Sequence, residues 1–200
     1  MLYSPVSLIM VESRFNPFEE RLARDIRNEL SAAILQVFAE MDITPALKIA
    51  RHYLAIPHES VHEKYIYDRL SRYEQALAII LDEKLVSAWD QALVLWDLKL
   101  FFEVHEILEH AWLPATGAEK LVLQAMIRAA GMYIKLHDQR NETGARKMAA
   151  KAADTLEANR QAVPPGLPLD LLLAKLRNID PSPPLLRSTP AFAKDSEAQE

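Results

Sequence analysis

The sequence predicts an all-α protein, a multi-helix, bundle-like array of about six to eight helices that pack as antiparallel hairpins. Apolar residues recur at spacings of three and four over most of the chain, whereas no segment alternates convincingly between apolar and polar residues. Only 4 glycines accompany 12 prolines, and the prolines cluster at the ends of the periodic segments. This composition disfavours a turn-rich β fold.

The first half of the chain contains four periodic segments. Asn16, Pro17 and Glu19 have the pattern of a helix start, and the apolar period that follows predicts a helix that continues to about Met41. Three further helices are predicted. The first covers Thr44–Leu54, the second runs from a capping box at Ser60–Glu63 to about residue 80, and the third covers residues 85–96.

The second half predicts four more helices, over residues 100–112, 118–137, 143–158 and 169–178. Pro114–Gly117 predicts a turn, so that the helices on either side of it form a hairpin. Residues 181–200 contain four prolines and little periodicity, which predicts a disordered tail. We therefore divide the chain into a helical N-terminal region (1–95), a second helical domain (96–180) and this tail.

Charge and cysteine content exclude several classes of protein. The chain carries 23 Lys and Arg against 28 Asp and Glu, without a dense basic stripe, so nucleic acid is not an expected partner. The absence of cysteine excludes disulfides, thiolate metal sites and a cysteine nucleophile, and it suits the reducing cytoplasm, where we expect the protein to be located. Residues 1–10 lack the features of a signal peptide, and the apolar runs are too short for membrane insertion.

The segment from Phe101 to Trp112 concentrates the side chains that can carry chemistry. On a helix, His105 and Glu109 share one face with Phe101, Phe102, Leu108 and Trp112, which predicts a buried imidazole–carboxylate pair. Glu103, Glu106 and His110 fall on another face, which we interpret as solvated, with Glu106 nearest the buried side.

The next predicted helix offers partners for this pair. Gln124, Arg128, Gly131 and Lys135 form a stripe beside an apolar face, and the small residues Ala129 to Gly131 permit a close approach of helices. A hairpin across Pro114–Gly117 is expected to place Gln124 or Arg128 near Glu109.

These residues resemble a known family. Over roughly residues 96–178 the sequence is similar to the bacterial domain of unknown function 309 family. The similarity lies in three stretches, namely the run from Phe102 to Trp112 with its His-Glu-x-x-Glu motif, Leu123-Gln124, and Asn141-Glu-Thr-Gly-Ala145. The resemblance implies a compact all-α fold in which the His-Glu helix packs against the Leu-Gln helix, and it implies no activity. It marks six residues of this chain, namely His105, Glu106, Glu109, Trp112, Gln124 and Gly144. Arg128 and Lys135 depart from the family pattern, which more often has Gln and His there.

Two interpretations of His105 and Glu109 remain open. Imidazole and carboxylate four residues apart on a helix can share a metal ion, or act as an acid and a base, but no third ligand can be named. We favour the alternative that the pair is structural, with Trp112 as a packing residue.

For function, the first hypothesis is a non-catalytic binding or scaffold module with an unidentified protein partner. The alternative is a small metal-assisted hydrolase that uses His105 and Glu109 with Glu106 or Gln124. We expect no cofactor, because no phosphate loop, nucleophile elbow or dinucleotide fingerprint occurs. The sequence does not determine the oligomeric state.

Overall fold

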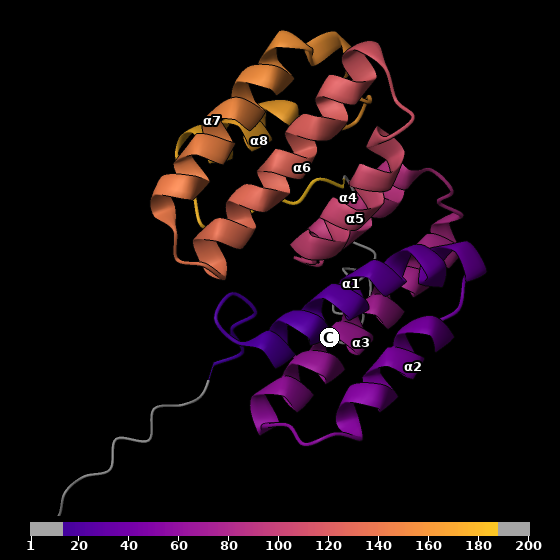
Figure 1. Cartoon of the computed structure of the whole chain (residues 1–200). Coiled ribbons are helices and arrows are strands. Elements are labelled where there is room, and N and C mark those ends of the chain that lie inside the picture. The colour runs from indigo at the N-terminus through magenta and orange to yellow at the C-terminus, as the bar shows by residue number, and fades with distance from the viewer. Residues whose placement is uncertain (1–13, 188–200) are drawn as a thin grey trace, which may run out of the picture.

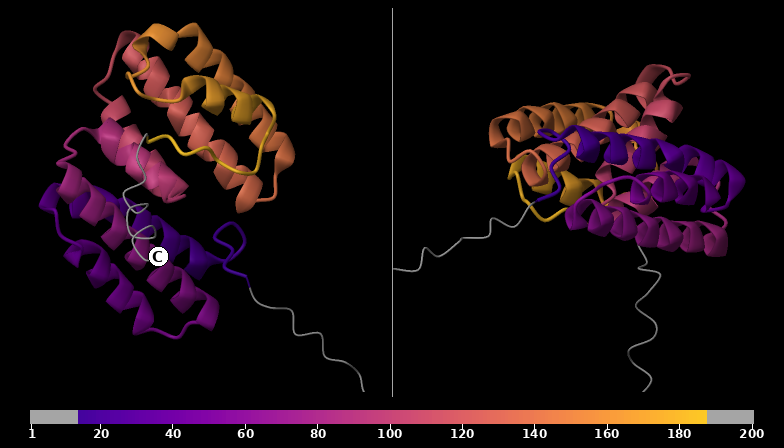
Figure 2. Two further views of the ribbon diagram at one scale, coloured as in Figure 1. Left: turned by 180° about the vertical axis from the view of Figure 1, so that it is seen from behind. Right: turned by 60° about the horizontal axis from the view of Figure 1, so that its bottom comes forward.

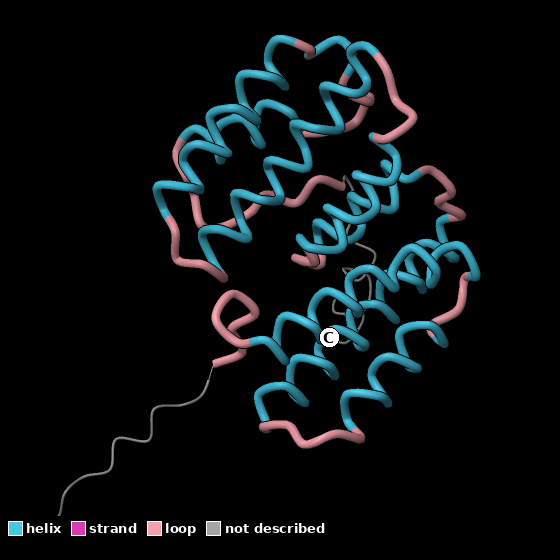
Figure 3. The backbone as a smooth tube through the Cα atoms, viewed as in Figure 1, coloured by secondary structure: helices cyan, strands magenta, loops and turns pink. Residues whose placement is uncertain are grey.

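Eight α-helices and one short 3-10 helix make up most of residues 14–187, the part of the chain that this computed structural model describes, and no strand occurs among those residues (Figures 1 and 3). The helices are α1 (Arg21–Glu40), α2 (Thr44–Leu54), α3 (Ser60–Glu83), α4 (Ala88–Asp97), α5 (Phe101–Trp112), α6 (Gly117–His137), α7 (Glu142–Ala158) and α8 (Leu169–Arg177), with the 3-10 helix at Arg160–Ala162. The prediction of an all-α array is confirmed.

Three helix starts differ from the predictions because the capping residues are not the expected ones. Helix α4, predicted from residue 85, begins at Ala88, since the Ser87 side chain accepts a hydrogen bond from the backbone N–H of Asp90. The Asn16 side chain accepts a hydrogen bond from the backbone N–H of Phe18 at 3.1 Å and so caps a separate turn, and α1 begins only at Arg21. The capping box of α3 lies one residue earlier than expected, since Glu59 and His62 supply its two side chains. Neighbouring residues that can all cap compete, and a sequence pattern does not decide between them.

Helices α4 and α5 lie between two groups of helices, α1–α3 on one side and α6–α8 on the other (Figures 1 and 2). Helix α5 packs against α4, α1 and α6, while α6 and α7 form the most extensive antiparallel pair. The segment with the His-Glu motif is therefore enclosed from several directions, and this placement decides which of its side chains are buried.

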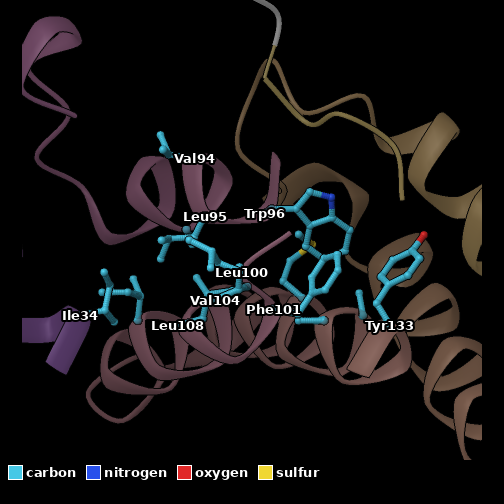
Figure 4. Packing of buried hydrophobic residues seen from close by; sticks show 14 of the residues in the cluster. Ile34, Val94, Leu95, Trp96, Leu100, Phe101, Val104, Leu108 and Tyr133 are labelled. Carbon is cyan, nitrogen blue, oxygen red and sulfur yellow. The ribbon is translucent and has the colours of Figure 1, made fainter. Parts of the chain in front are cut away.

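The centre of the hydrophobic core is an aromatic cluster where α4, α5 and α6 meet. The Trp96 ring packs edge-on against the rings of Phe101 and Tyr133, with centroid distances of 5.3 and 5.5 Å, and the latter two stack at 5.0 Å (Figure 4). All three side chains are buried. Because aromatic rings bury large apolar areas, this cluster anchors α5 against α6.

Residues 181–187 are packed against α4, so the prediction of a disordered tail is wrong for them. The indole N–H of Trp96 donates to the carbonyl of Pro184 at 2.9 Å. The Leu186 side chain is buried, and its backbone N–H donates to Asp97 Oδ1 at 2.7 Å. Residues 188–200, the rest of the predicted tail, lie outside the described part of the chain.

None of the helices within residues 14–187 has both the length and the apolar character needed to cross a membrane.

Candidate functional site

His105 and Glu109 form the expected contact on α5, with His105 Nδ1 3.5 Å from Glu109 Oε2, but the pair is not buried. The His105 side chain is 39% exposed and that of Glu109 is 52% exposed, so the prediction of a buried pair is wrong. The buried residues of α5 are instead Phe101, Glu103, Val104, Ile107 and Leu108. The buried side of α5 is displaced from the predicted one because three helices cover it.

We expect small and nearly additive losses when this pair is removed. Solvated ion pairs contribute about 0–1 kcal/mol, so His105→Leu and Glu109→Leu are each expected to change the free energy of unfolding by less than about 1 kcal/mol. A double-mutant cycle followed by urea unfolding at neutral pH tests this, since contacts between side chains that matter for stability show coupling. A coupling energy of several kcal/mol would contradict the exposed geometry.

The other predicted site residues form no hydrogen bond or ion pair with His105 or Glu109 in the described part of the chain. Trp112 ends α5 half-buried, with the Lys120 ammonium 4.4 Å from the centroid of its ring. Gln124 and Arg128 are half-buried on α6, and neither forms a hydrogen bond or an ion pair with another residue of the range 14–187. The expectation that Gln124 or Arg128 lies near Glu109 is thus not accompanied by a hydrogen bond or an ion pair between them among the described residues.

Glu103, expected on a solvated face, is the fully buried carboxylate of α5. Its Oε1 accepts a hydrogen bond of 2.6 Å from the Tyr73 hydroxyl, and its Oε2 lies 3.4 Å from Nη1 of Arg69. We call these three residues the Glu103 cluster. Arg69 and Tyr73 are four residues apart on α3, a spacing that could have indicated a shared partner.

The Glu103 cluster continues into a stack of rings. The Tyr65 ring lies between the Arg69 guanidinium, 4.8 Å from its centroid, and the Phe15 ring, stacked at 3.7 Å. Burial lowers the pKa of Arg69, but the negative charge of Glu103 and the neighbouring tyrosines outweigh it and raise this pKa overall. Burial also raises the pKa of Tyr65, so that its hydroxyl stays protonated and remains a hydrogen-bond donor.

A groove of about 290 Å³ opens between α1, α5, α6 and α7, next to the family motif. We call it the Arg27 groove, after the residue of α1 whose guanidinium lies 4.3 Å from the centroid of the Phe102 ring. His105, Glu106 and Lys135 also line it. Two of the marked motif residues, His105 and Glu106, are thus brought together with a basic residue of α1 that the sequence did not single out.

The charge in the Arg27 groove is predominantly positive. Burial lowers the pKa of Arg27, an effect opposed by Tyr65 and by nearby carboxylates that include Glu106. Burial raises the pKa of Glu106, helped by Glu109 and Glu103 and opposed by His105 and Arg27. Arg27 and Lys135 therefore face one carboxylate that ionises less readily than usual.

The Asn-x-x-Gly motif shapes this groove through Lys135. Asn141 caps α7 by accepting a hydrogen bond of 2.8 Å from the backbone N–H of Gly144. A Cβ at Gly144 would lie 2.8 Å from Cδ of Lys135, so a larger residue there would force the lysine side chain to shift. On α6, a Cβ at Gly131 would lie 2.9 Å from Sδ of Met148, which explains the close packing of α6 and α7.

For a metal ion, the described residues offer an incomplete ligand set. Within residues 14–187, no group of three or more His, Asp and Glu side chains is close enough together to hold a metal ion. His105 and Glu109 thus have no third protein ligand of these types in that range.

Comparisons with curated proteins and with solved structures gave no match. A family model matches residues 89–148, which run from α4 into α7 and contain the His-Glu motif, Gln124 and the Asn-x-x-Gly motif. The resemblance was expected over residues 96–178. The match therefore begins seven residues earlier than expected, and it also ends thirty residues earlier. Residues 89–148 are thus similar to the family described as Domain of unknown function (DUF309), a match that covers less than half of the chain.

Proposed function

We propose that the protein is a non-catalytic binding module and that the Arg27 groove binds a small ligand with an apolar body and an acidic group. Binding sites for small molecules are concave and mostly apolar, with a few polar groups that fix orientation. The Arg27 groove has this composition, since the side chains of Phe18, Phe102, Ile134 and Met148 line it along with its charged residues.

The observation that carries this proposal is the state of Arg27. Its side chain forms no hydrogen bond or ion pair with any residue of the range 14–187, although it is half-buried. The rings of Phe102 and Phe18 hold the guanidinium at 4.3 and 5.4 Å from their centroids. An arginine that is oriented by aromatic rings and keeps its donors free is suited to bind a carboxylate or phosphate group.

The hydrolase alternative centred on His105 and Glu109 has less support. It needs a further ligand for the metal ion, and the described residues place none of the usual types beside this pair. The binding proposal depends only on groups that already face one groove.

The test compares octanoate with 1-octanol, which share an apolar chain and differ in the acidic group. We expect octanoate to bind at least about tenfold more tightly in isothermal titration calorimetry, because a charge-assisted hydrogen bond contributes about 1.5–3 kcal/mol. Arg27→Met keeps the apolar stem of the side chain and removes its charge, and it is expected to abolish this preference.

Arg51→Met is the matched control, because Arg51 is exposed on α2 and does not line the groove. This variant is expected to bind octanoate as the wild type does. Equal binding of octanoate by the wild type and Arg27→Met, or no binding by the wild type, would contradict the proposal.

A further inference from the structure

The Arg27 groove contains a cation and a carboxylate that are not paired with each other. Arg27 and Glu106 both line the groove, and each is half-buried. Neither side chain forms a hydrogen bond or an ion pair with another residue of the range 14–187. Charged groups that lose part of their hydration are stabilised by a partner, so two unpaired charges in one groove point to a ligand that pairs with both.

The two charged groups lie on the same side of α5. The guanidinium of Arg27 is 4.3 Å from the centroid of the Phe102 ring. Phe102 and Glu106 are four residues apart on α5, a spacing that places two side chains next to each other on one face of a helix. Phe102 thus holds the guanidinium on the side of α5 that carries Glu106, and both charged groups face one groove of about 290 Å³.

The other charged residues of the groove have partners of their own. The ammonium of Lys135 donates a hydrogen bond of 3.1 Å to Oε1 of Gln139. Nδ1 of His105 lies 3.5 Å from Oε2 of Glu109, a carboxylate that does not line the groove. Among the described residues, Glu106 is therefore the carboxylate of the groove that is available to a ligand.

A positively charged group on the ligand would also keep Glu106 ionised. Burial raises the pKa of Glu106, since a carboxylate in a partly apolar groove is poorly hydrated. A cation bound next to it favours the ionised form and so opposes this effect.

We propose that the ligand of the Arg27 groove is an α-amino acid with an apolar side chain, whose carboxylate binds Arg27 and whose ammonium group binds Glu106. The inference rests on the proposed function, because it assumes that the groove binds an acidic group at Arg27. In an α-amino acid the carboxylate and the ammonium group are attached to the same carbon, which suits a guanidinium and a carboxylate held on the same side of α5. The apolar side chain of the ligand lies against the apolar lining of the groove, which includes Phe18, Ile134 and Met148.

The test compares 2-aminooctanoate with octanoate, which share the apolar chain and the carboxylate and differ in the amine. The amine is protonated at neutral pH, and we expect the wild type to bind 2-aminooctanoate at least about tenfold more tightly in isothermal titration calorimetry. Glu106→Gln keeps the size of the side chain and removes its charge, so this variant is expected to bind the two ligands with similar affinity. Arg27→Met is expected to weaken the binding of both ligands, because both present a carboxylate.

Glu74→Gln is the matched control, because Glu74 is exposed on α3 and does not line the groove. This variant is expected to keep the preference of the wild type for 2-aminooctanoate. Equal affinity of the wild type for the two ligands, or a preference that persists in Glu106→Gln, would overturn the inference.

The same titrations distinguish this inference from the proposed function. Octanoate binding that depends on Arg27, without tighter binding of 2-aminooctanoate, would leave the proposed function standing and overturn the amino-acid ligand. If the wild type binds neither ligand, the proposed function is wrong and the amino-acid ligand with it.

Discussion

Replacing Glu103 by leucine is expected to lower the free energy of unfolding by about 3–5 kcal/mol, the usual cost of breaking a buried charge pair. The substitution leaves the Arg69 guanidinium without its closest carboxylate and removes the acceptor of the Tyr73 hydroxyl, which is fully buried. Urea unfolding of the wild type and the variant at neutral pH measures the loss.

Two further variants distinguish this effect from a general loss of stability on substitution of any residue of α5. Glu106→Gln changes a half-buried carboxylate without a hydrogen bond to a described residue, and we expect a change below about 1 kcal/mol. Combining Glu103→Leu with Arg69→Met removes both charges and is expected to cost less than the two single losses added together. A loss below about 1 kcal/mol for Glu103→Leu would contradict the burial of this pair.

The helices could be predicted from the sequence because their signals are local. Apolar spacing and turn residues identified all eight α-helices, with most ends within two or three residues of those observed. The exception is the start of α1, where Asn16 caps a turn and the helix begins at Arg21. Helix starts are less predictable because several nearby residues can cap.

The burial of Glu103 could not be predicted from α5 alone. The helical projection places Glu103 away from Phe101 and Leu108, which predicts a solvated side chain. In the structure α1, α4 and α6 pack around α5, and two side chains of α3 reach Glu103. The partners of Glu103 come from α3, about thirty residues earlier in the chain. Charged residues are rarely buried unless paired, and the pairing depends on tertiary structure.

The same limit applies to the Arg27 groove. The motif residues His105, Glu106 and Gly144 could be identified by their resemblance to a family, but Arg27 lies outside the matched range of 89–148. Its role depends on the contact between α1 and α5, which no local pattern of α1 reveals. In the proposed ligand site, α1 thus contributes groups that lie outside the family motif.

Truncating the chain after Pro183 is the second change with a large expected effect. It removes the acceptor of the Trp96 indole N–H and the buried side chain of Leu186. It also leaves Asp97 without the backbone N–H groups of Leu186 and Arg187, which donate to its two carboxylate oxygens at 2.7 and 3.2 Å. A sequence pattern does not reveal the packing of residues 184–187, because this segment contacts α4 through one apolar side chain and its backbone and has no apolar periodicity.

We expect this truncation to cost about 3–5 kcal/mol, since losing a buried leucine side chain alone costs about 2–5 kcal/mol. For a chain of this size, the melting temperature should fall by roughly 6–20 °C. Truncation after Arg187 is the control, because it keeps Trp96, Leu186 and Asp97 in all of these contacts. The difference between the two truncations isolates residues 184–187, and Leu186→Ala should reproduce much of it. Equal melting temperatures for both truncations would mean that the contacts of this segment with α4 do not stabilise the fold.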